Sequence, residues 1–389
     1  MNRNLWLLAA CQGLFLTNNV TFAAINGLVG LSLAPLGWMA TLPLMGYVVG
    51  GAISTGVVAG TQQRLGRKLS FLTGLAVAAI SALICAYAAS TRNFWLLCFG
   101  TVVAGYYNAN AGLYRFAAAE LAQPAAREKA VSLVMAGGLL GAVVGPNLAA
   151  QTRDYFAAPF VGAYLALAVV AALSAALLSF VTFTTPPRKA QAGQGRPLSQ
   201  IMRQPIFIVA AASGALGYGV MNLLMASTPI AMQQCALPFS DIAFVLQWHV
   251  IGMFAPGFFT GHLIKRFGAL PVMGVGVLLN LGCVAVALSG LDVAQFTLAL
   301  LLLGVGWNFL FTGSTTLSLS AYGPDEKDRA QGALNFFVFA TLALSSFSSG
   351  VLVTTRGWTW LNYGSLLPLA LAGGAIVWLQ LRTARPATA

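Results

Sequence analysis

Charged side chains are scarce in this sequence of 389 residues. Only 7% of the residues are Asp, Glu, Lys or Arg, whereas 58% are hydrophobic, and the mean hydropathy is +0.81. Soluble domains carry charge on about a quarter of their residues, because polar groups must cover a surface that faces water. The composition therefore excludes a soluble globular protein and indicates a chain embedded in a membrane.

Acidic side chains are the rarer of the two charged kinds, and all of them fall in predicted loops or at predicted helix ends: Glu120, Glu128, Asp154, Asp241, Asp292, Asp325, Glu326 and Asp328. A carboxylate inside a membrane is costly, so transporters place one there where it has a function such as proton coupling. Without one, an ordinary proton-driven drug exporter is not expected. No nucleophile with a general base and no acid pair can be assembled, which argues against an enzyme.

Twelve apolar runs of about twenty residues or more are present, and each is long enough to cross a hydrocarbon core about 30 Å thick as a helix. The first run is too long and too uncharged for a cleaved signal peptide, so we expect it to remain as a span. The predicted spans are Leu5–Leu31, Gly37–Thr61, Leu69–Ala89, Phe94–Ala118, Ala130–Ala150, Ala158–Phe183, Pro205–Met232, Phe239–Gly261, Ala269–Ser289, Ala294–Ser320, Ala330–Val353 and Trp358–Leu381.

Positive charge is distributed unevenly over the loops between these spans. If the amino terminus is cytoplasmic, sixteen Lys and Arg lie on the cytoplasmic side, whereas Arg92, Arg153 and Arg356 lie on the other. This bias predicts a bacterial inner-membrane protein with both termini in the cytoplasm. The net charge of +12 then follows from topology and contact with anionic lipids, and no nucleic-acid partner is expected.

The five cysteines are too scattered to predict a disulfide framework. Four lie inside predicted spans, where a thiol packs as a small apolar group: Cys11, Cys85, Cys98 and Cys283. Cys235 instead follows the seventh span, on the predicted periplasmic side, where oxidation can occur.

One polar segment divides the spans into two sets of six. Residues 184–204 are rich in Pro, Gly, Gln and Arg, which predicts a cytoplasmic linker between a bundle over residues 1–183 and a second over residues 205–389. Each half has a tight basic turn between its second and third spans, Arg64 to Lys68 and Lys265 to Gly268. We interpret the chain as a fused duplication whose halves rock about a central site.

The first of these turns carries a resemblance to the major facilitator superfamily, whose signature reads Asp-Arg-x-Gly-Arg-Arg. Residues 63–68 match it except that Gln63 replaces the acid, and Lys265 stands at that place in the second copy. The resemblance implies an all-α major facilitator fold of twelve transmembrane helices. The missing acids remove the basis for the family's charge relay, although the turn is retained. The fifth span resembles the family's Gly-x-x-x-Gly-Pro motif, in which small residues allow close helix contact: Gly137, Gly141, Gly145 and Pro146.

His249 is the one ionisable side chain predicted to lie deep in the membrane, near the middle of the eighth span. Met253 follows it by four residues, and Met221 and Met225 have the same spacing in the seventh span. Positions i and i+4 share a helix face, so each pair projects together. Thioether sulfur and neutral imidazole suit Cu(I). The two spans are joined by a short connection, which predicts antiparallel neighbours whose four ligands converge.

These two motifs resemble those of the CcoA-type copper importers, a major facilitator subgroup. The resemblance implies import of copper as the transported substrate, for assembly of haem-copper cytochrome oxidase, with periplasmic or cytoplasmic copper chaperones as partners and no prosthetic group. It also points to thiols in some members, for which Cys235 is the candidate here. We expect the carrier to act as a monomer.

A second interpretation keeps the architecture and changes the cargo to a small organic molecule such as riboflavin, which related carriers are similar enough to transport; an efflux carrier is a further alternative. Amides and aromatics along the first, fourth and tenth spans favour it, although interhelical hydrogen bonding explains them equally well: Asn18, Asn19, Asn26, Tyr106, Tyr107, Asn108, Asn110, Trp307 and Asn308. The candidate substrate-pathway residues are Asn19, Asn108, Asn110, Arg115, Gln247 and Asn308.

Overall fold

The computed structural model of the protein describes residues 3–123, 126–183 and 195–384. Every regular element within these ranges is a helix, as the sequence predicts. The first half contains α1 (Arg3–Leu33), η1 (Gly37–Met39), α2 (Leu42–Ser90), α3 (Phe94–Ala111), α4 (Tyr114–Leu121), α5 (Arg127–Thr152) and α6 (Val161–Ser179). The second contains α7 (Leu198–Met202), α8 (Pro205–Gln234), α9 (Phe239–Phe254), α10 (Gly257–Phe267), α11 (Ala269–Ser289), α12 (Val293–Ser318), η3 (Leu319–Ala321), η4 (Pro324–Glu326), α13 (Lys327–Thr355) and α14 (Gly357–Ala384).

The predicted fold class, an all-α membrane protein, is confirmed. Ten helical stretches within the described residues are long and apolar enough to cross a membrane. The stretch that contains α2 reverses direction within its length, so it corresponds to two of the predicted spans. The helices α3 and α4 together correspond to one further span, so the helices account for the twelve predicted spans. Two predicted spans are interrupted, because α3 and α4 are separated at residues 112–113 and α9 and α10 at residues 255–256.

The turn inside α2 lies at Gly66, where the backbone has φ 76° and ψ 169°. The hydroxyl oxygens of Thr61 and Ser70 lie 3.1 Å apart, although nine residues of straight helix would rise about 13.5 Å. The chain therefore reverses here, as the basic turn predicts. Gly268, between α10 and α11, has nearly the same conformation, with φ 91° and ψ 162°. The sequence repeat is thus also a repeat of backbone geometry.

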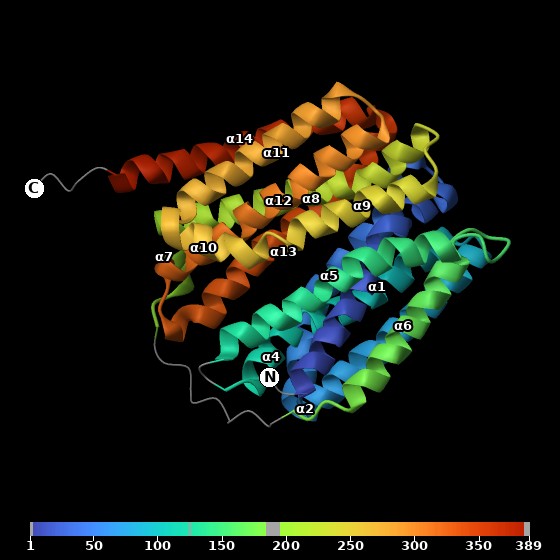
Figure 1. The fold of residues 1–389 in the computed structure, drawn as a ribbon, viewed down its shortest axis with the longest axis horizontal. Coiled ribbons are helices and arrows are strands. Elements are labelled where there is room, and N and C mark those ends of the chain that lie inside the picture. The colour runs from blue at the N-terminus through green and yellow to red at the C-terminus, as the bar shows by residue number, and fades with distance from the viewer. Residues whose placement is uncertain (1–2, 124–125, 184–194, 385–389) are drawn as a thin grey trace, which may run out of the picture.

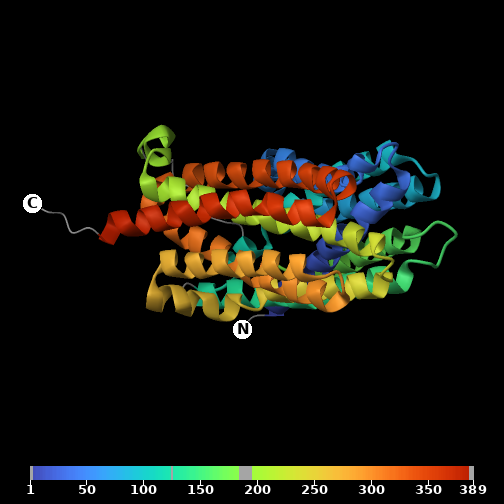
Figure 2. The ribbon, with the colours of Figure 1, turned by 90° about the horizontal axis from the view of Figure 1, so that it is seen from above.

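Figure 1 shows two bundles, α1–α6 and α8–α14, and in the view from above most helices run along the long axis of the molecule (Figure 2). In the first bundle α1 packs against α5 and α6, and α2 against α3. In the second, α12 packs against α8, α9 and α11, and α8 also packs against α13 and α14. Part of the predicted linker, residues 184–194, lies outside the described residues, and the rest contains the short helix α7.

The glycines of α5 allow close approach to α1. A Cβ atom built on Gly137 would lie 2.2 Å from the Ala9 carbonyl oxygen, and one on Gly141 would lie 2.5 Å from the Thr17 nitrogen. Side chains at either position would force the helices apart. The packing interpretation of this motif is confirmed.

Contacts between the two halves cluster at one end of the molecule. Thr41 Oγ1 donates to the Ser346 carbonyl at 2.6 Å and accepts from the Gly350 nitrogen at 3.0 Å. Asn147 Nδ2 donates to Gln247 Oε1 at 2.8 Å. This end carries the α1–α2, α5–α6 and α8–α9 connections, and the charge distribution predicts that it is periplasmic.

Ion pairs at the opposite end stay within one half. Arg67, in the first basic turn, pairs with Glu120 of α4. Arg196 pairs with Glu326, with 2.8 Å between Nη2 and Oε2, and so fastens the end of the linker beside α13. Glu120, on another helix, therefore supplies an acid to this turn although Gln63 does not. This ion pair was not predicted from the sequence.

Candidate functional site

Asn19 of α1 is the centre of a polar group in the first half. Its Nδ2 atom donates to the Tyr47 hydroxyl at 3.2 Å and to Asn108 Oδ1 at 3.4 Å, so it joins α1 to α2 and α3. Phe22, one turn along α1, stacks on the Tyr47 ring with centroids 5.4 Å apart. Asn19 and Asn108 are only partly buried, which leaves part of their surface accessible. The result is a neutral polar site with an aromatic ring beside it.

An aromatic cluster lies on the corresponding helices of the second half. Trp307 and Phe311 of α12 stack with centroids 5.3 Å apart and planes 8° from parallel. Tyr218 of α8 meets both rings edge to face, at 5.1 and 5.2 Å. Phe254 of α9 packs edge to face on Trp307 at 6.3 Å. Three helices therefore contribute to one aromatic surface.

The polar group and the aromatic cluster face each other across the two halves. Tyr218 lies close enough to Tyr47 and to Arg115, both from the first half, for their charged forms to influence one another. Arg115 lies in α4, toward the end opposite the inter-half contacts, and its guanidinium lies 4.9 Å from the centroid of the Phe116 ring. A solute between the halves would meet amides and a phenol on one side and aromatic rings on the other.

The structure places the predicted metal ligand His249 in the core of the second half, where it is fully buried. Its Nδ1 atom lies 2.8 Å from the Leu300 carbonyl oxygen of α12, so Nδ1 carries the proton and Nε2 is an acceptor. Among the described residues, Nε2 has no hydrogen-bond partner. Met253, one turn along α9, is also buried.

The other two predicted ligands lie on α8, which is not the direct neighbour of α9 along its length. α12 packs against both helices, whereas α8 and α9 have little contact with each other. Met221 is buried and Met225 is partly exposed. α8 and α9 therefore both pack on α12, and the expected side-by-side packing of the seventh and eighth spans is wrong. Cys235 ends α8 as its C-cap, partly exposed and without a disulfide partner.

The remaining pathway candidates use their amide groups within the protein. Asn110 Nδ2 donates to the Ser70 carbonyl at 2.9 Å, and Gln247 accepts from Asn147. Asn308 Nδ2 donates to the Met253 carbonyl at 2.7 Å, where the interruption between α9 and α10 leaves backbone groups to be satisfied. The structure thus brings Asn19 and Asn108 together and gives the other three amides contacts between helices.

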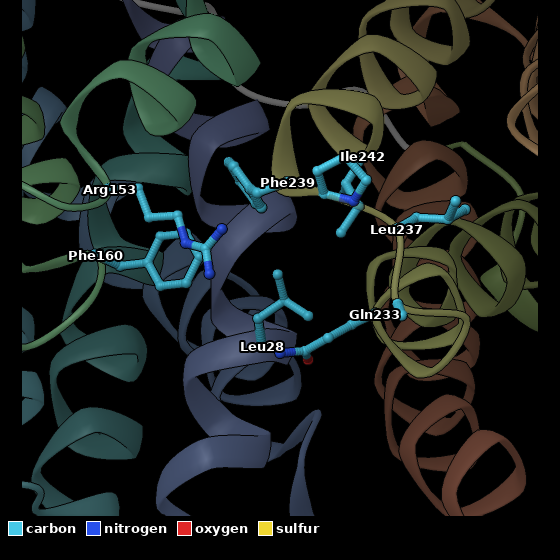
Figure 3. Close-up of a pocket in the computed structure, with 9 residues that line it drawn as sticks. Leu28, Arg153, Phe160, Gln233, Leu237, Phe239 and Ile242 are labelled. Carbon is cyan, nitrogen blue, oxygen red and sulfur yellow. The ribbon is translucent and has the colours of Figure 1, made fainter.

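A pocket of about 230 Å³ lies at the end where the halves touch (Figure 3). The guanidinium carbon of Arg153 lies 5.4 Å from the Phe160 ring centroid and 5.6 Å from that of Phe239, which belongs to the other half. Leu28 and Gln233 also line the pocket. Its volume is below the 300–1,000 Å³ usual for small-molecule sites. We therefore interpret it as part of the closure between the halves.

Several residues of the central site were not among the sequence candidates. Tyr47, Tyr218 and Phe311 were missed because aromatic side chains make up 11% of the chain, so no single one stands out. Asn108 and Trp307 were among the amides and aromatics noted along the fourth and tenth spans. Phe311 lies one turn from Asn308 and Trp307 on the same helix, so a search for aromatic residues on the face of a central amide would have found it. The same search would have missed Tyr218, because its ring partners lie on another helix.

Comparisons with known proteins agree on the family. A family model described as Major Facilitator Superfamily matches residues 5–247 and 211–389. The riboflavin transporter RfnT of Brucella anthropi is 37% identical over 365 residues, which cover 93% of this chain and 92% of that protein. The uncharacterized MFS-type transporter YddS of Bacillus subtilis is 26% identical over 360 residues, 87% of this chain and 82% of that protein.

Solved structures share the fold. The nucleoside transporter NupG superposes with a TM-score of 0.77 at 14% identity, over 96% of this chain and 99% of that one. A bacterial homologue of the lysosomal transporter Spinster, solved in an inward-facing and occupied conformation, gives a TM-score of 0.73 at 16% identity, over 99% and 98% of the two chains.

Proposed function

The chain belongs to the Major Facilitator Superfamily, and we propose that this multi-pass transporter carries riboflavin into the cell across the bacterial inner membrane. The observation that carries the proposal is the 37% identity to a riboflavin transporter over nearly the whole length of both chains. This reverses the order of the two interpretations drawn from the sequence, in which copper import came first. Catalysis is not part of the proposal.

The central site supports a cargo of this chemistry. Riboflavin is uncharged and combines a flat aromatic ring system, a polar edge of carbonyl and N–H groups, and a hydroxylated side chain. The Trp307, Phe311 and Tyr218 rings offer a stacking surface, and Asn19, opposite them, offers an amide. An uncharged cargo needs no buried countercharge, which agrees with a site whose buried polar groups are neutral and whose nearby cation, Arg115, is exposed.

Uptake is proposed over efflux because the acidic residues lie in loops and at helix ends, so the carboxylate of an ordinary proton-driven exporter is missing from the predicted membrane interior. Two halves joined at one end also fit alternating access, in which that closure opens as the other end closes.

The test is riboflavin uptake in a bacterial strain that can neither make nor import the vitamin. We expect the gene to restore growth at low external riboflavin and to produce saturable uptake of labelled riboflavin, which unlabelled riboflavin suppresses. Growth without measurable uptake, or uptake no faster than in the empty-vector strain, would overturn the proposal.

Copper import is the second candidate, and His249 is the observation that favours it. Its Nδ1 atom is fixed by a backbone carbonyl and its Nε2 atom is free to accept, which is how protein ligands to metal ions are commonly oriented. Met253 supplies a thioether one turn away. If copper is the cargo, His249→Ala and Met221→Ala should abolish copper accumulation in a strain lacking the gene. Full accumulation by both variants would dismiss this candidate.

A further inference from the structure

Two tryptophans of the second half are equally buried but differ in their hydrogen bonding. Trp307 and Trp358 are each 7% exposed. The Trp358 indole N–H donates to the Ala287 carbonyl at 3.0 Å, and this hydrogen bond joins α14 to α11. The Trp307 indole N–H has no partner among the residues that the structure describes. A buried indole N–H usually finds a partner, so the unpaired donor on α12 needs an explanation.

The position of Trp307 on α12 shows where its side chain points. Gly304 and Asn308 lie on the face of α12 that contacts α9, and Leu310 and Ser314 lie on the face that contacts α8. At about 100° per residue, Trp307 falls between these two faces. Its ring therefore projects between α8 and α9, toward the first half of the chain.

The rings around Trp307 leave room for a flat partner at their edge. Phe254 and Tyr218 pack on Trp307 edge to face, and Phe311 covers one face of the indole. Tyr218, Phe254 and Phe311 are all partly exposed, unlike the buried indole. A planar solute that stacks on the accessible rings would bring its own edge close to the indole N–H.

We propose that Trp307 is a specificity-determining residue whose indole N–H donates a hydrogen bond to a ring carbonyl of the transported solute. The proposal rests on the proposed function, and the solute it requires is a planar heteroaromatic ring with a carbonyl acceptor at its edge, such as the dione edge of a flavin. An analogue without that acceptor would leave the indole donor buried and unpaired, so the site would reject it.

The experiment compares two matched variants of the full chain in lipid nanodiscs. Trp307→Phe removes the unpaired donor and keeps an aromatic ring, and Trp358→Phe removes the paired donor at equal burial. We expect Trp307→Phe to weaken riboflavin binding about fivefold by calorimetry, the change expected for one net hydrogen bond. Its thermal stability should fall less than that of Trp358→Phe, because both variants lose the same ring volume but only Trp358→Phe loses an internal hydrogen bond. Trp358→Phe should lower thermal stability and leave the riboflavin Kd unchanged.

A riboflavin analogue that carries a thiocarbonyl in place of one ring carbonyl separates donation from packing, since sulfur is a weak acceptor. The analogue in which the carbonyl that accepts from Trp307 is replaced should bind the unaltered protein more weakly than riboflavin. The Trp307→Phe variant should bind this analogue and riboflavin equally. Trp307→His, which retains a ring N–H, provides a second variant should Trp307→Phe fail to fold.

The outcomes separate the two proposals. If the unaltered protein does not bind riboflavin, the proposed function fails. If it binds riboflavin and Trp307→Phe binds with the same Kd, or discriminates against the thio-analogues as the unaltered protein does, the role of Trp307 is overturned while the function stands.

Discussion

At the scale of single residues, the polar group at the centre of the candidate site consists of neutral side chains. Asn19, Tyr47 and Asn108 form a hydrogen-bonded group between helices. The ionised side chains that do pair, such as Arg67 with Glu120, lie at helix ends. Burying an amide or a hydroxyl costs far less than burying a charge, so such a site can be emptied at each transport cycle without leaving an unpaired ion.

Glu326 is the acid whose pairing makes the clearest prediction about stability. The Arg196 guanidinium, and then the Gly323 N–H, hold the pKa of its carboxyl at about 2, below the ordinary value of 4.5. A lowered pKa stabilises the fold above the ordinary value, and this stabilisation is lost as the pH falls from about 4.5 toward about 2. We expect Glu326→Gln to have a lower Tm than the unaltered protein at pH 7, and the difference to shrink as the pH falls below 5.

The control for this prediction is Asp325→Asn, which removes a charge from the exposed neighbouring side chain. Its Tm should follow that of the unaltered protein across the pH range. A Tm difference for Glu326→Gln that stays constant down to pH 3 would show that the Arg196 ion pair does not provide the stabilisation.

At the scale of elements, apolar length determines the helices and glycine determines the two equivalent turns. Gly66 and Gly268 share a backbone region that is essentially restricted to glycine, and a Cβ atom at Gly66 would meet nothing within 4 Å. Any cost of a side chain at Gly66 must therefore come from the backbone and not from crowding.

We expect Gly66→Ala and Gly268→Ala each to destabilise the protein by about 1–3 kcal/mol, the cost of holding a side-chain-bearing residue in that region. Thermal unfolding in detergent measures the effect. Gly60→Ala and Gly274→Ala are the matched controls, because both positions are helical and open, and alanine there favours the helix. If the turn variants and their controls unfold at the same temperature, the turns carry no such strain.

Features that depend on a local stretch of sequence were predictable, whereas contacts between residues far apart in the chain were not. The span Ala269–Ser289 agrees with α11 at both ends, because a glycine stands at each side of an apolar run. The basic turn at Gly66 was predicted from its local pattern. Its partner Glu120 was not, because the pair joins residues 53 positions apart through tertiary packing.

In the candidate site, too, individual polar residues were predicted but the packing of the helices that carry them was not. Asn19 and Asn108 were predicted because amides are unusual in apolar helices, and the structure joins them. The direct packing of α8 and α9 was inferred from their short connection and is wrong, because α12 packs between them. Which helices become neighbours depends on the whole bundle, so residues such as Tyr218 could be assigned to the site only from the structure.

At the scale of the whole molecule, the halves are held together at one end by contacts that must break for the cargo to enter from that side. Arg153 is central to this closure, since its guanidinium contacts the Phe160 ring of its own half and the Phe239 ring of the other (Figure 3). The two rings also pack edge to face, with centroids 5.0 Å apart. A cation that contacts both rings gains from each, at about 0.5–1 kcal/mol for each exposed contact.

Replacing Arg153 with Gln should therefore shift the equilibrium toward opening at this end by about 1–2 kcal/mol, or five- to thirtyfold. Cys235 provides the readout, because its neighbours Gln233 and Ala236 line the pocket beside Arg153 and the residue itself is partly exposed. We expect a membrane-impermeant maleimide, added outside intact cells, to label Cys235 faster in Arg153→Gln than in the unaltered protein. Riboflavin should slow this labelling if it favours the closed end.

Arg92→Gln is the matched control, because Arg92 lies at the same end but its side chain donates to the Ser32 carbonyl within the first half. Its loss removes an equal charge without breaking a contact between halves, so Cys235 should be labelled at the unaltered rate. Equal labelling rates in both variants would mean that the contacts of Arg153 with the two rings do not hold the halves together. The Thr41 hydrogen bonds to α13 would then be the closure to test. Labelling that appears only after the membrane is permeabilised would show that this end faces the cytoplasm, contrary to the orientation that the positive charges predict.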